Sequence, residues 1–265
     1  MATTTLDLVQ AGMQNPEPIF KVVTAFEAAG ILHSLFYTSG MPGAAAAPSS
    51  LNGAALTTYA GQIPFTNPVS GNSHLALLEG AATVAGTLLI CDRLWHNGSI
   101  GITTTTEQGI TSPAWPARDL DGATAGRGIM VGLEVSGVTG GGAVTNTTMR
   151  YTSSANVNTR TATMASFPAS AVAGTFVPFQ LQAGDVGVKS IQGLTLGTTY
   201  VSGTIHMVAY RVLGRIGIGP ERTTSKDIFQ LAKPRMYNGT VPFCLWRPST
   251  TGACNIDASV AWTQG

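Results

Sequence analysis

The stretch that decides the fold covers residues 174–213. It contains Thr175-Phe-Val-Pro-Phe-Gln-Leu181 and Gln182-Ala-Gly-Asp-Val-Gly-Val-Lys-Ser-Ile191, and it ends in Ser202-Gly-Thr-Ile-His-Met-Val-Ala-Tyr-Arg-Val-Leu213. Each run is short and rich in β-branched or aromatic residues, and glycine-centred turns separate the runs, as is typical of β-strands. Such strands cannot bury their apolar faces alone, so we expect a sheet that the rest of the chain completes.

The flanking sequence continues the same pattern of strand-sized segments broken by Gly and Pro turns. Further strands are expected near residues 129–138, 144–152, 161–167, 241–246 and 255–262. Many short strands with few helices are typical of β-sandwiches and barrels. The sequence therefore predicts an all-β fold, most plausibly a jelly-roll-like β-sandwich with a short N-terminal helix and an extended arm.

The N-terminal helix is predicted for residues 16–29, after a polar arm. Asn15 is a suitable cap, Pro16 suits the first helical position, and Gly30 suits the C-terminal cap. Four apolar residues follow at helical spacing and are our candidate assembly contacts: Ile19, Val22, Val23 and Phe26. The alternative is that this apolar face covers one end of the chain's own sandwich.

Residues 39–50 have the composition of a linker, with prolines on both sides of an alanine run. This predicts two parts, an arm and helix at residues 1–50 and a β-sandwich body at residues 51–265. We expect the body to fold without the arm, because domain boundaries fall in segments of this composition.

Charged residues make up only 10% of the chain, and the formal net charge is +1. Few charges leave little coverage by solvated side chains, so the protein is expected to associate with copies of itself or with another protein. The three cysteines are irregularly spaced and are expected to be free, buried thiols, although Cys244 and Cys254 could face each other across a final hairpin. The first residues lack the features of a signal peptide, so synthesis in a cytoplasm is expected, with no membrane partner.

No pattern of catalytic or metal-binding residues stands out. The four histidines are scattered, and His206 alternates within a strand, which favours a satisfied core histidine over a metal ligand. Asp119-Leu-Asp121-Gly122 is similar to the start of a calcium loop, but later ligands are missing, so a turn stabilised by aspartates is favoured. Phosphate-binding and hydrolase motifs are also missing. We therefore expect no enzyme activity, metal or cofactor.

Six basic residues lie close together in the sequence between positions 211 and 235, where Glu221 and Asp227 are also present. A nucleic-acid site would need a stripe with interleaved aromatic residues, and nucleic acid is not the expected partner. A loop that pairs with acidic groups on a partner protein, and an ordinary solvated loop, both stay open. The six residues are Arg211, Arg215, Arg222, Lys226, Lys233 and Arg235.

Several segments together resemble a family of tailed-bacteriophage virion proteins. They are residues 178–188 and 202–211, together with Leu94-Trp95-His96, residues 112–119 and the final Trp262-Thr-Gln-Gly265. These are structural motifs rather than a site signature, and the resemblance implies a structural component of a phage particle.

Within such a particle, the absence of a long spine helix argues against the major shell protein. A head decoration or cement protein on the capsid exterior fits better, as a compact β-sandwich with an arm free to reach its neighbours. We expect it to bind the phage major capsid protein and to form a homo-oligomer, with a trimer preferred. A tail or fibre subunit is the first alternative. A carbohydrate-binding adhesion module is the second, because four tryptophans could stack on sugars: Trp95, Trp115, Trp246 and Trp262.

Overall fold

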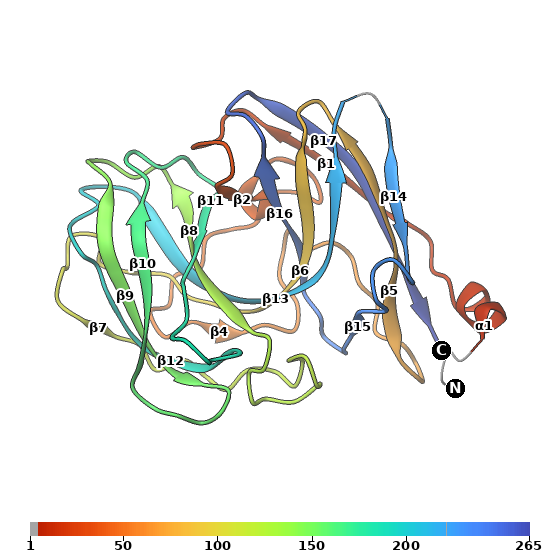
Figure 1. Cartoon of the computed structure of the whole chain (residues 1–265), viewed down its shortest axis with the longest axis horizontal. Helices are drawn as coiled ribbons and strands as arrows, with labels where there is room; N and C mark the ends of the chain where they lie inside the picture. Colours follow the sequence, from red (N-terminus) through yellow and green to blue (C-terminus); the bar gives the residue numbers. More distant parts are fainter. Residues whose placement is uncertain (1–4, 221) are drawn as a thin grey trace. The chain divides into compact units, whose positions relative to one another are not determined.

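The computed structural model describes residues 5–220 and 222–265 and is built almost entirely of antiparallel strands (Figure 1). The chain divides into two compact units. The first contains Met1–Ala45, Thr57–Asp92 and Val212–Gly265, and the second contains Ala46–Leu56 and Arg93–Arg211. The division falls within two long strands, β6 (Gly86–His96) and β13 (Thr204–Ile218).

The first unit has an outer sheet in the order β14-β5-β17-β1-β3, with β15 also paired to β5. A second layer contains β16, which pairs with both β2 and β6. The 3-10 turn η1 contacts β16 through the rings of Phe36 and Phe243. A largely aliphatic core that includes Leu78, Ile90 and Val260 lies between the layers. The elements are α1 (Leu6–Ala11), β1 (Glu17–Val23), β2 (Leu32–Ser34), η1 (Leu35–Tyr37), β3 (Gly40–Met41), β5 (Ser73–Ala82), β14 (Thr224–Asp227), β15 (Arg235–Met236), β16 (Pro242–Pro248) and β17 (Cys254–Gln264).

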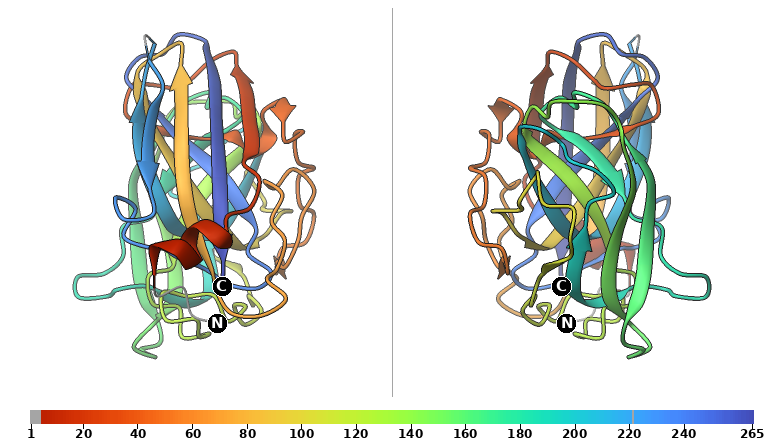
Figure 2. Two further views of the ribbon diagram at one scale, coloured as in Figure 1. Left: turned by 90° about the vertical axis from the view of Figure 1, so that its right-hand side faces the viewer. Right: turned by 90° about the vertical axis from the view of Figure 1, so that its left-hand side faces the viewer.

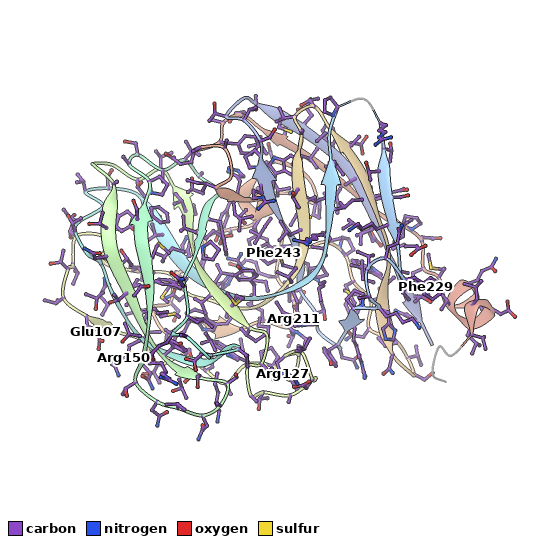
Figure 3. All side chains as sticks on the ribbon, viewed as in Figure 1. Glu107, Arg127, Arg150, Arg211, Phe229 and Phe243 are labelled. Carbon is purple, nitrogen blue, oxygen red and sulfur yellow. The ribbon has the colours of Figure 1, made fainter. Side chains whose placement is uncertain are left out.

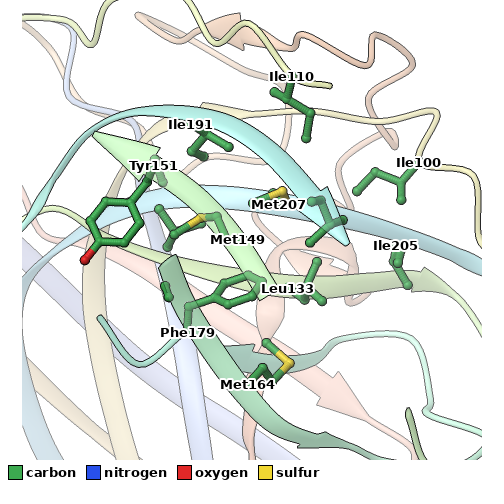
Figure 4. Close-up of a cluster of buried hydrophobic side chains, with 14 of the residues drawn as sticks. Ile100, Ile110, Leu133, Met149, Tyr151, Met164, Phe179, Ile191, Ile205 and Met207 are labelled. Atoms are coloured by element: carbon green, nitrogen blue, oxygen red, sulfur yellow. The ribbon is translucent and has the colours of Figure 1, made fainter. Parts of the chain in front are cut away.

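The second unit is also a sandwich of two antiparallel layers. One layer has the order β10-β9-β12-β7, and in the other β8 pairs with β11 and with residues 204–210 of β13, while β4 pairs with the end of β6. Figure 4 shows part of the core between them, where Leu133, Met149 and Phe179 lie together. The elements are β4 (Ala54–Ala55), β7 (Gln108–Gly109), β8 (Met130–Gly137), β9 (Val144–Ser153), β10 (Arg160–Phe167), β11 (Thr175–Pro178) and β12 (Val188–Thr195).

The predicted all-β sandwich class with a short N-terminal helix is confirmed, and β13 forms where the sequence predicted the strand of residues 202–213. The cysteine prediction is also confirmed. Cys91, Cys244 and Cys254 are free and buried, and the strands that carry Cys244 and Cys254 belong to different layers of the first unit.

The helix predicted for residues 16–29 is wrong, because this segment contains strand β1 and the short helix lies earlier, at Leu6–Ala11. Alternate residues of β1 point inward, among them Ile19 and Val23, but the inward position between them is Lys21. Its ammonium group donates to the carbonyls of Thr38 (3.0 Å) and Pro42 (2.5 Å). A buried lysine at an inward position hides the alternation of a strand and leaves an apparently helical spacing.

The structure divides the chain differently from the predicted boundary at residue 50. Strand β1 pairs along its whole length with β17, from Glu17↔Val260 to Val23↔Cys254. Folding of residues 51–265 without residues 1–50 stays a prediction. The pairing gives a reason to expect the opposite, since removing β1 would expose the edge of a central strand and part of the core.

Candidate functional site

The candidate site is the outer face of the β14-β5-β17-β1-β3 sheet, which is turned toward the viewer in the left panel of Figure 2. Residues directly opposite each other on paired strands share a face of the sheet. Phe20 is paired with Met41 on one side and with Asp257 on the other, and Asp257 is paired with Ala81. Val22 and Asn255 form the next row. We call these six residues the outer face.

One side of the outer face carries large apolar side chains that remain in contact with solvent. Phe20 is 44% exposed, Val22 39% and Met41 54%. They are the outward residues of β1 and its neighbour β3, so the alternation that buries Ile19 and Val23 necessarily directs Phe20 and Val22 outward. The Lys21 ammonium holds residues 38–42 against β1 and so fixes Met41 beside Phe20.

The other side of the outer face is hollowed and lined mainly by small residues. A hollow of about 660 Å³ lies over Ala81 and Asn255, and the described residues that line it include the charged Arg222 and Asp257. Its rim is formed by the turn after β13 and the end of β5, with Thr83, Gly219, Pro220 and Thr223. Ala82 N–H donates to the Gly219 carbonyl at 3.2 Å, which ties this turn to the sheet.

The opposite end of the sheet is covered by the N-terminal segment. Gly12 accepts a hydrogen bond from Gln264 N–H at 2.9 Å, Gln14 N–H donates to Trp262 at 2.8 Å, and Met13 forms a bridge with Thr263. In the left panel of Figure 2, α1 crosses this end of the sheet. Large apolar side chains beside a hollow are suited to contact with another protein surface, because exposed apolar patches mark interaction sites.

The four candidate assembly contacts lie on both sides of this sheet. Ile19, Val23 and Phe26 are buried in the core of the first unit at 1%, 3% and 6% exposure, which agrees with the alternative that they cover their own sandwich. Val22 lies on the outer face. As a contact to another subunit, it stays a prediction. The sequence analysis missed Phe20, for which strand alternation would have been the signal.

The second unit contains a buried network of charged side chains. Both guanidinium NH groups of Arg93 donate to the Glu134 carboxylate, at 3.0 and 2.5 Å, and Arg93 Nε donates to His96 Nδ1 at 3.0 Å. Arg118 donates to the carbonyls of Leu56 (2.8 Å) and Arg93 (3.2 Å). Burial, and then the nearby Arg93 charge, lower the pKa of His96 to about 2, so this imidazole is neutral at pH 7.

His206 also belongs to the buried interior of the second unit. Its Nε2 lies 2.6 Å from the Ser136 hydroxyl oxygen, and its Nδ1 lies 2.9 Å from the Asn97 carbonyl oxygen. The carbonyl can only accept, so Nδ1 carries the proton and Nε2 accepts from the serine. Burial lowers the pKa of His206. The imidazole is fully buried with both nitrogens satisfied, which confirms the predicted core histidine.

The Asp119 segment is a turn organised by a buried carboxylate, as the sequence favoured. Its two oxygens accept from the backbone N–H groups of Asp121, Ala123, Gly126 and Arg127 at 2.8–3.3 Å. Asp121 pairs instead with the exposed Arg127 guanidinium, which is labelled in Figure 3. The N–H donors occupy the carboxylate that a calcium ion would need. No cluster of three or more potential metal ligands occurs in the described part of the chain.

The basic segment separates into distinct environments. Arg211 is buried in the second unit, whereas in the first unit Lys233 lies 5.4 Å from the ring centroid of Phe229 and Arg235 lies 4.8 Å from that of Tyr237. Burial, with Arg235 and then Lys233, lowers the pKa of His74. These cation–π pairs interleave basic and aromatic residues only locally. A loop that pairs with acidic groups on a partner protein and an ordinary solvated loop both stay open for the segment.

The four tryptophans are at most 2% exposed, so they cannot stack on a sugar ring in this structure. Trp95 and Trp115 donate instead to the carbonyls of Asn52 (3.0 Å) and Val188 (2.7 Å). Between residues 5 and 265, with residue 221 set aside, no helix has the length and apolar character needed to cross a membrane.

Comparison with known proteins adds little. No protein-family model matches the sequence, and a comparison with curated proteins finds no match. A structure of the infectious bursal disease virus Gx strain aligns with 97% of this chain and 82% of its own at 10% identity, with a TM-score of 0.23. A crystal structure of the VP2 subviral particle of the same virus aligns over 96% and 81% at 9% identity, with a TM-score of 0.18. Likenesses this weak carry no argument about this chain.

Proposed function

We propose that this chain is a non-enzymatic structural protein of a virus particle, and that it acts as a head decoration or cement protein of a tailed bacteriophage. In this role it binds the major capsid protein on the capsid exterior and stabilises the shell. The resemblance to phage virion proteins and the low content of charged residues support the proposal. The observation that carries it is the outer face, an exposed apolar surface with a hollow beside it.

Burial of such a surface is favourable in proportion to the apolar area removed from water, by roughly 25 cal/mol per Å². Stable protein–protein interfaces bury about 1,600 Å² in total, with large apolar and aromatic anchors near the centre. Phe20, Val22 and Met41 supply such anchors. Of the two strands that carry them, β1 is paired along its length with β17, and β3 is paired with β1. The geometry is therefore suited to docking rather than to chemistry.

The test is to mix the purified chain with phage heads that lack it and with isolated tails, and to measure cosedimentation. Saturable binding to heads, with a rise in the temperature at which the heads release DNA, is the expected result. Saturable binding to tails alone would favour the tail or fibre alternative, and no binding to either would refute the particle role.

Two further parts of the proposal need their own measurements. The preferred trimer stays a prediction. Measuring the mass of the protein, both free and bound to heads, gives its oligomeric state and tests this prediction. The adhesion alternative has lost its tryptophan platform, and a glycan array is expected to show no binding. Turnover of a peptidoglycan, polysaccharide or nucleic-acid substrate, abolished by a single substitution, would contradict the non-enzymatic role.

A further inference from the structure

We infer that the hollow beside Phe20 binds an arginine side chain of the partner protein that covers the outer face. The inference rests on the proposed structural role, in which a capsid protein is that partner. It names the chemical group that the partner brings to this surface, which the role itself leaves open. All of the residues that carry the inference belong to the first unit.

Asp257 is the charged residue in the middle of the outer face. In the strand pairing it lies between Phe20 on one side and Ala81 on the other, so these three residues form one row across the sheet. Its carboxylate is exposed and forms no hydrogen bond or ion pair with any residue that the structure describes. A partner that covers Phe20 and fills the hollow therefore also removes this carboxylate from water.

The removal of an unpaired carboxylate from water is costly, because the charge loses its hydration. A cation that pairs with the carboxylate offsets this cost. The chain's own Arg222 lines the same hollow, but no ion pair joins it to Asp257 in the described part of the chain. The cation therefore has to come from the partner.

A second carboxylate lies in the neighbouring row of the same face. Glu79 is paired with Ser259, whose hydroxyl donates to Glu79 Oε1 at 2.8 Å. Residues two positions apart on a strand share a face, so Glu79 points the same way as Ala81, and Ser259 the same way as Asp257. The described charges near the hollow are thus two carboxylates and the guanidinium of Arg222, a balance that favours a cationic group on the partner.

The groups around the hollow suit arginine better than lysine. A planar guanidinium pairs with a carboxylate through two parallel hydrogen bonds and also stacks on aromatic rings. Phe20, which is 44% exposed, lies directly opposite Asp257, where Cβ atoms are about 4.5–5.5 Å apart, so one guanidinium can contact both. The hollow of about 660 Å³ includes Ala81 and Pro220 in its lining and has room for the apolar stem of the arginine.

The first test needs no virus particle. The full chain, with isotope-labelled methionine methyl groups, is titrated with N-acetyl-arginine N-methylamide and followed by NMR. The reporter is the methyl signal of Met41, the residue paired with Phe20, and Met41→Leu identifies it. A saturable shift is expected with the arginine probe and none with the citrulline analogue, which has a similar shape and no charge. Asp257→Asn is expected to abolish the shift.

The second test measures the affinity of the full chain for phage heads that lack it. Asp257→Asn is expected to lower this affinity by about 10- to 100-fold, as for the loss of a hydrogen bond between charged groups. Arg222→Gln is expected to raise the affinity severalfold, because it removes a like charge from beside the partner's arginine. The matched control is Asp121→Asn, which changes an exposed carboxylate of the second unit and is expected to have no effect. Circular dichroism melts establish that each variant is folded.

Three outcomes would overturn the inference. They are an arginine probe that shifts Met41 no more than its citrulline analogue does, equal head affinities for Asp257→Asn and Asp121→Asn, and weaker binding by Arg222→Gln, which would indicate an acidic partner group. Head binding that Asp257→Asn leaves unchanged would refute the arginine site and leave the proposed function standing. A chain that binds the arginine probe and no phage particle would do the reverse.

Discussion

The two units are built from the same antiparallel sandwich plan, yet they differ in the charged side chains that they bury: the first encloses Lys21 and Asp92, and the second encloses Arg93, Arg118, Asp119, Glu134 and Arg211. The second unit encloses charge, with Arg93, Glu134 and Asp119 all fully buried. The first unit has a largely aliphatic core and leaves Phe20 and Met41 in solvent. In a chain with so few charged residues, those enclosed in one unit cannot keep the surface of the other polar.

The difference shows that buried charge and exposed apolar surface have different consequences in one chain. A buried ion pair is weak evidence for stability, because desolvation of the two charges opposes their attraction. Its multiple directional hydrogen bonds do fix how neighbouring strands and loops meet. The apolar area of Phe20, Val22 and Met41 that stays in solvent is not buried by folding, and exposed apolar patches mark interaction sites.

The largest expected effect comes from a deletion that removes strands of the first unit. Deletion of residues 1–50 removes β1, β2 and β3 from the first unit, together with the buried side chains of Ile19, Val23 and Phe26. We expect the truncated chain to be insoluble or to lose the cooperative melt of the first unit, measured by circular dichroism and calorimetry. A soluble, cooperatively melting chain that starts at Leu51 would instead establish the boundary predicted from the sequence.

The next effect tests the enclosed charge. Glu134→Gln leaves the Arg93 guanidinium buried without its counter-charge and is expected to lower the free energy of unfolding by about 3–5 kcal/mol, measured by urea denaturation. The exposed pair of Glu107 and Arg150, labelled in Figure 3, supplies the control, since Glu107→Gln is expected to cost at most about 1 kcal/mol.

A double variant sharpens this comparison. Replacing both partners, as Arg93→Met with Glu134→Leu, removes the desolvation cost together with the pair and is expected to recover most of the loss. Equal destabilisation by Glu134→Gln and Glu107→Gln would show that the buried network is not what holds the second unit together.

The Asp119 turn gives a smaller effect in the same unit. Asp119→Ala removes the acceptor for backbone N–H groups from residue 121 to residue 127 and is expected to cost on the order of 2–3 kcal/mol. Asp121→Ala, which removes only an exposed ion pair, is expected to cost less than about 1 kcal/mol. Added calcium is expected to change neither value. Stabilisation of the wild type by calcium would revive the calcium-loop interpretation.

The smallest effect is a pH dependence. The pKa of His96 is about 2 in the folded protein and 6.5 in the reference state, so between these values the unfolded chain binds a proton that the folded chain does not. The free energy of unfolding therefore falls as the pH drops below 6.5, by about 1.4 kcal/mol per pH unit for one such group. Between pH 7 and pH 5 the wild type is expected to lose about 2 kcal/mol more than His96→Gln does. Parallel urea titrations at the two pH values measure this difference, and equal losses would contradict it.

The sequence predicts what local pattern controls. The strand of residues 202–213, the Asp119 turn, the satisfied His206 and the free cysteines all follow from alternation, turn chemistry or residue type. Strand β1 does not, because its inward Lys21 is stabilised by carbonyls of residues 38 and 42, which only the folded chain brings near. The Arg93–Glu134 pair spans 41 residues for the same reason.

The outer face could be predicted from the sequence only in part. Its bulky half follows from the alternation of β1 once that segment is known to be a strand. Its hollow does not, since it combines Ala81, Arg222 and Asp257 from three distant parts of the chain. The low content of charged residues indicated that part of the surface is buried by association. Long-range strand pairing decides which part of the surface carries the exposed apolar side chains.

Hydroxyl-radical footprinting of the assembled and dissociated protein tests the central claim most directly, because it reports the solvent contact of individual side chains. Our account predicts that oxidation of Phe20 and Met41 falls severalfold when the chain associates with a second copy or a phage head, while oxidation of Phe229 is unchanged. If Phe20 and Met41 react equally in the free and assembled states, the outer face of the first unit is not the assembly surface.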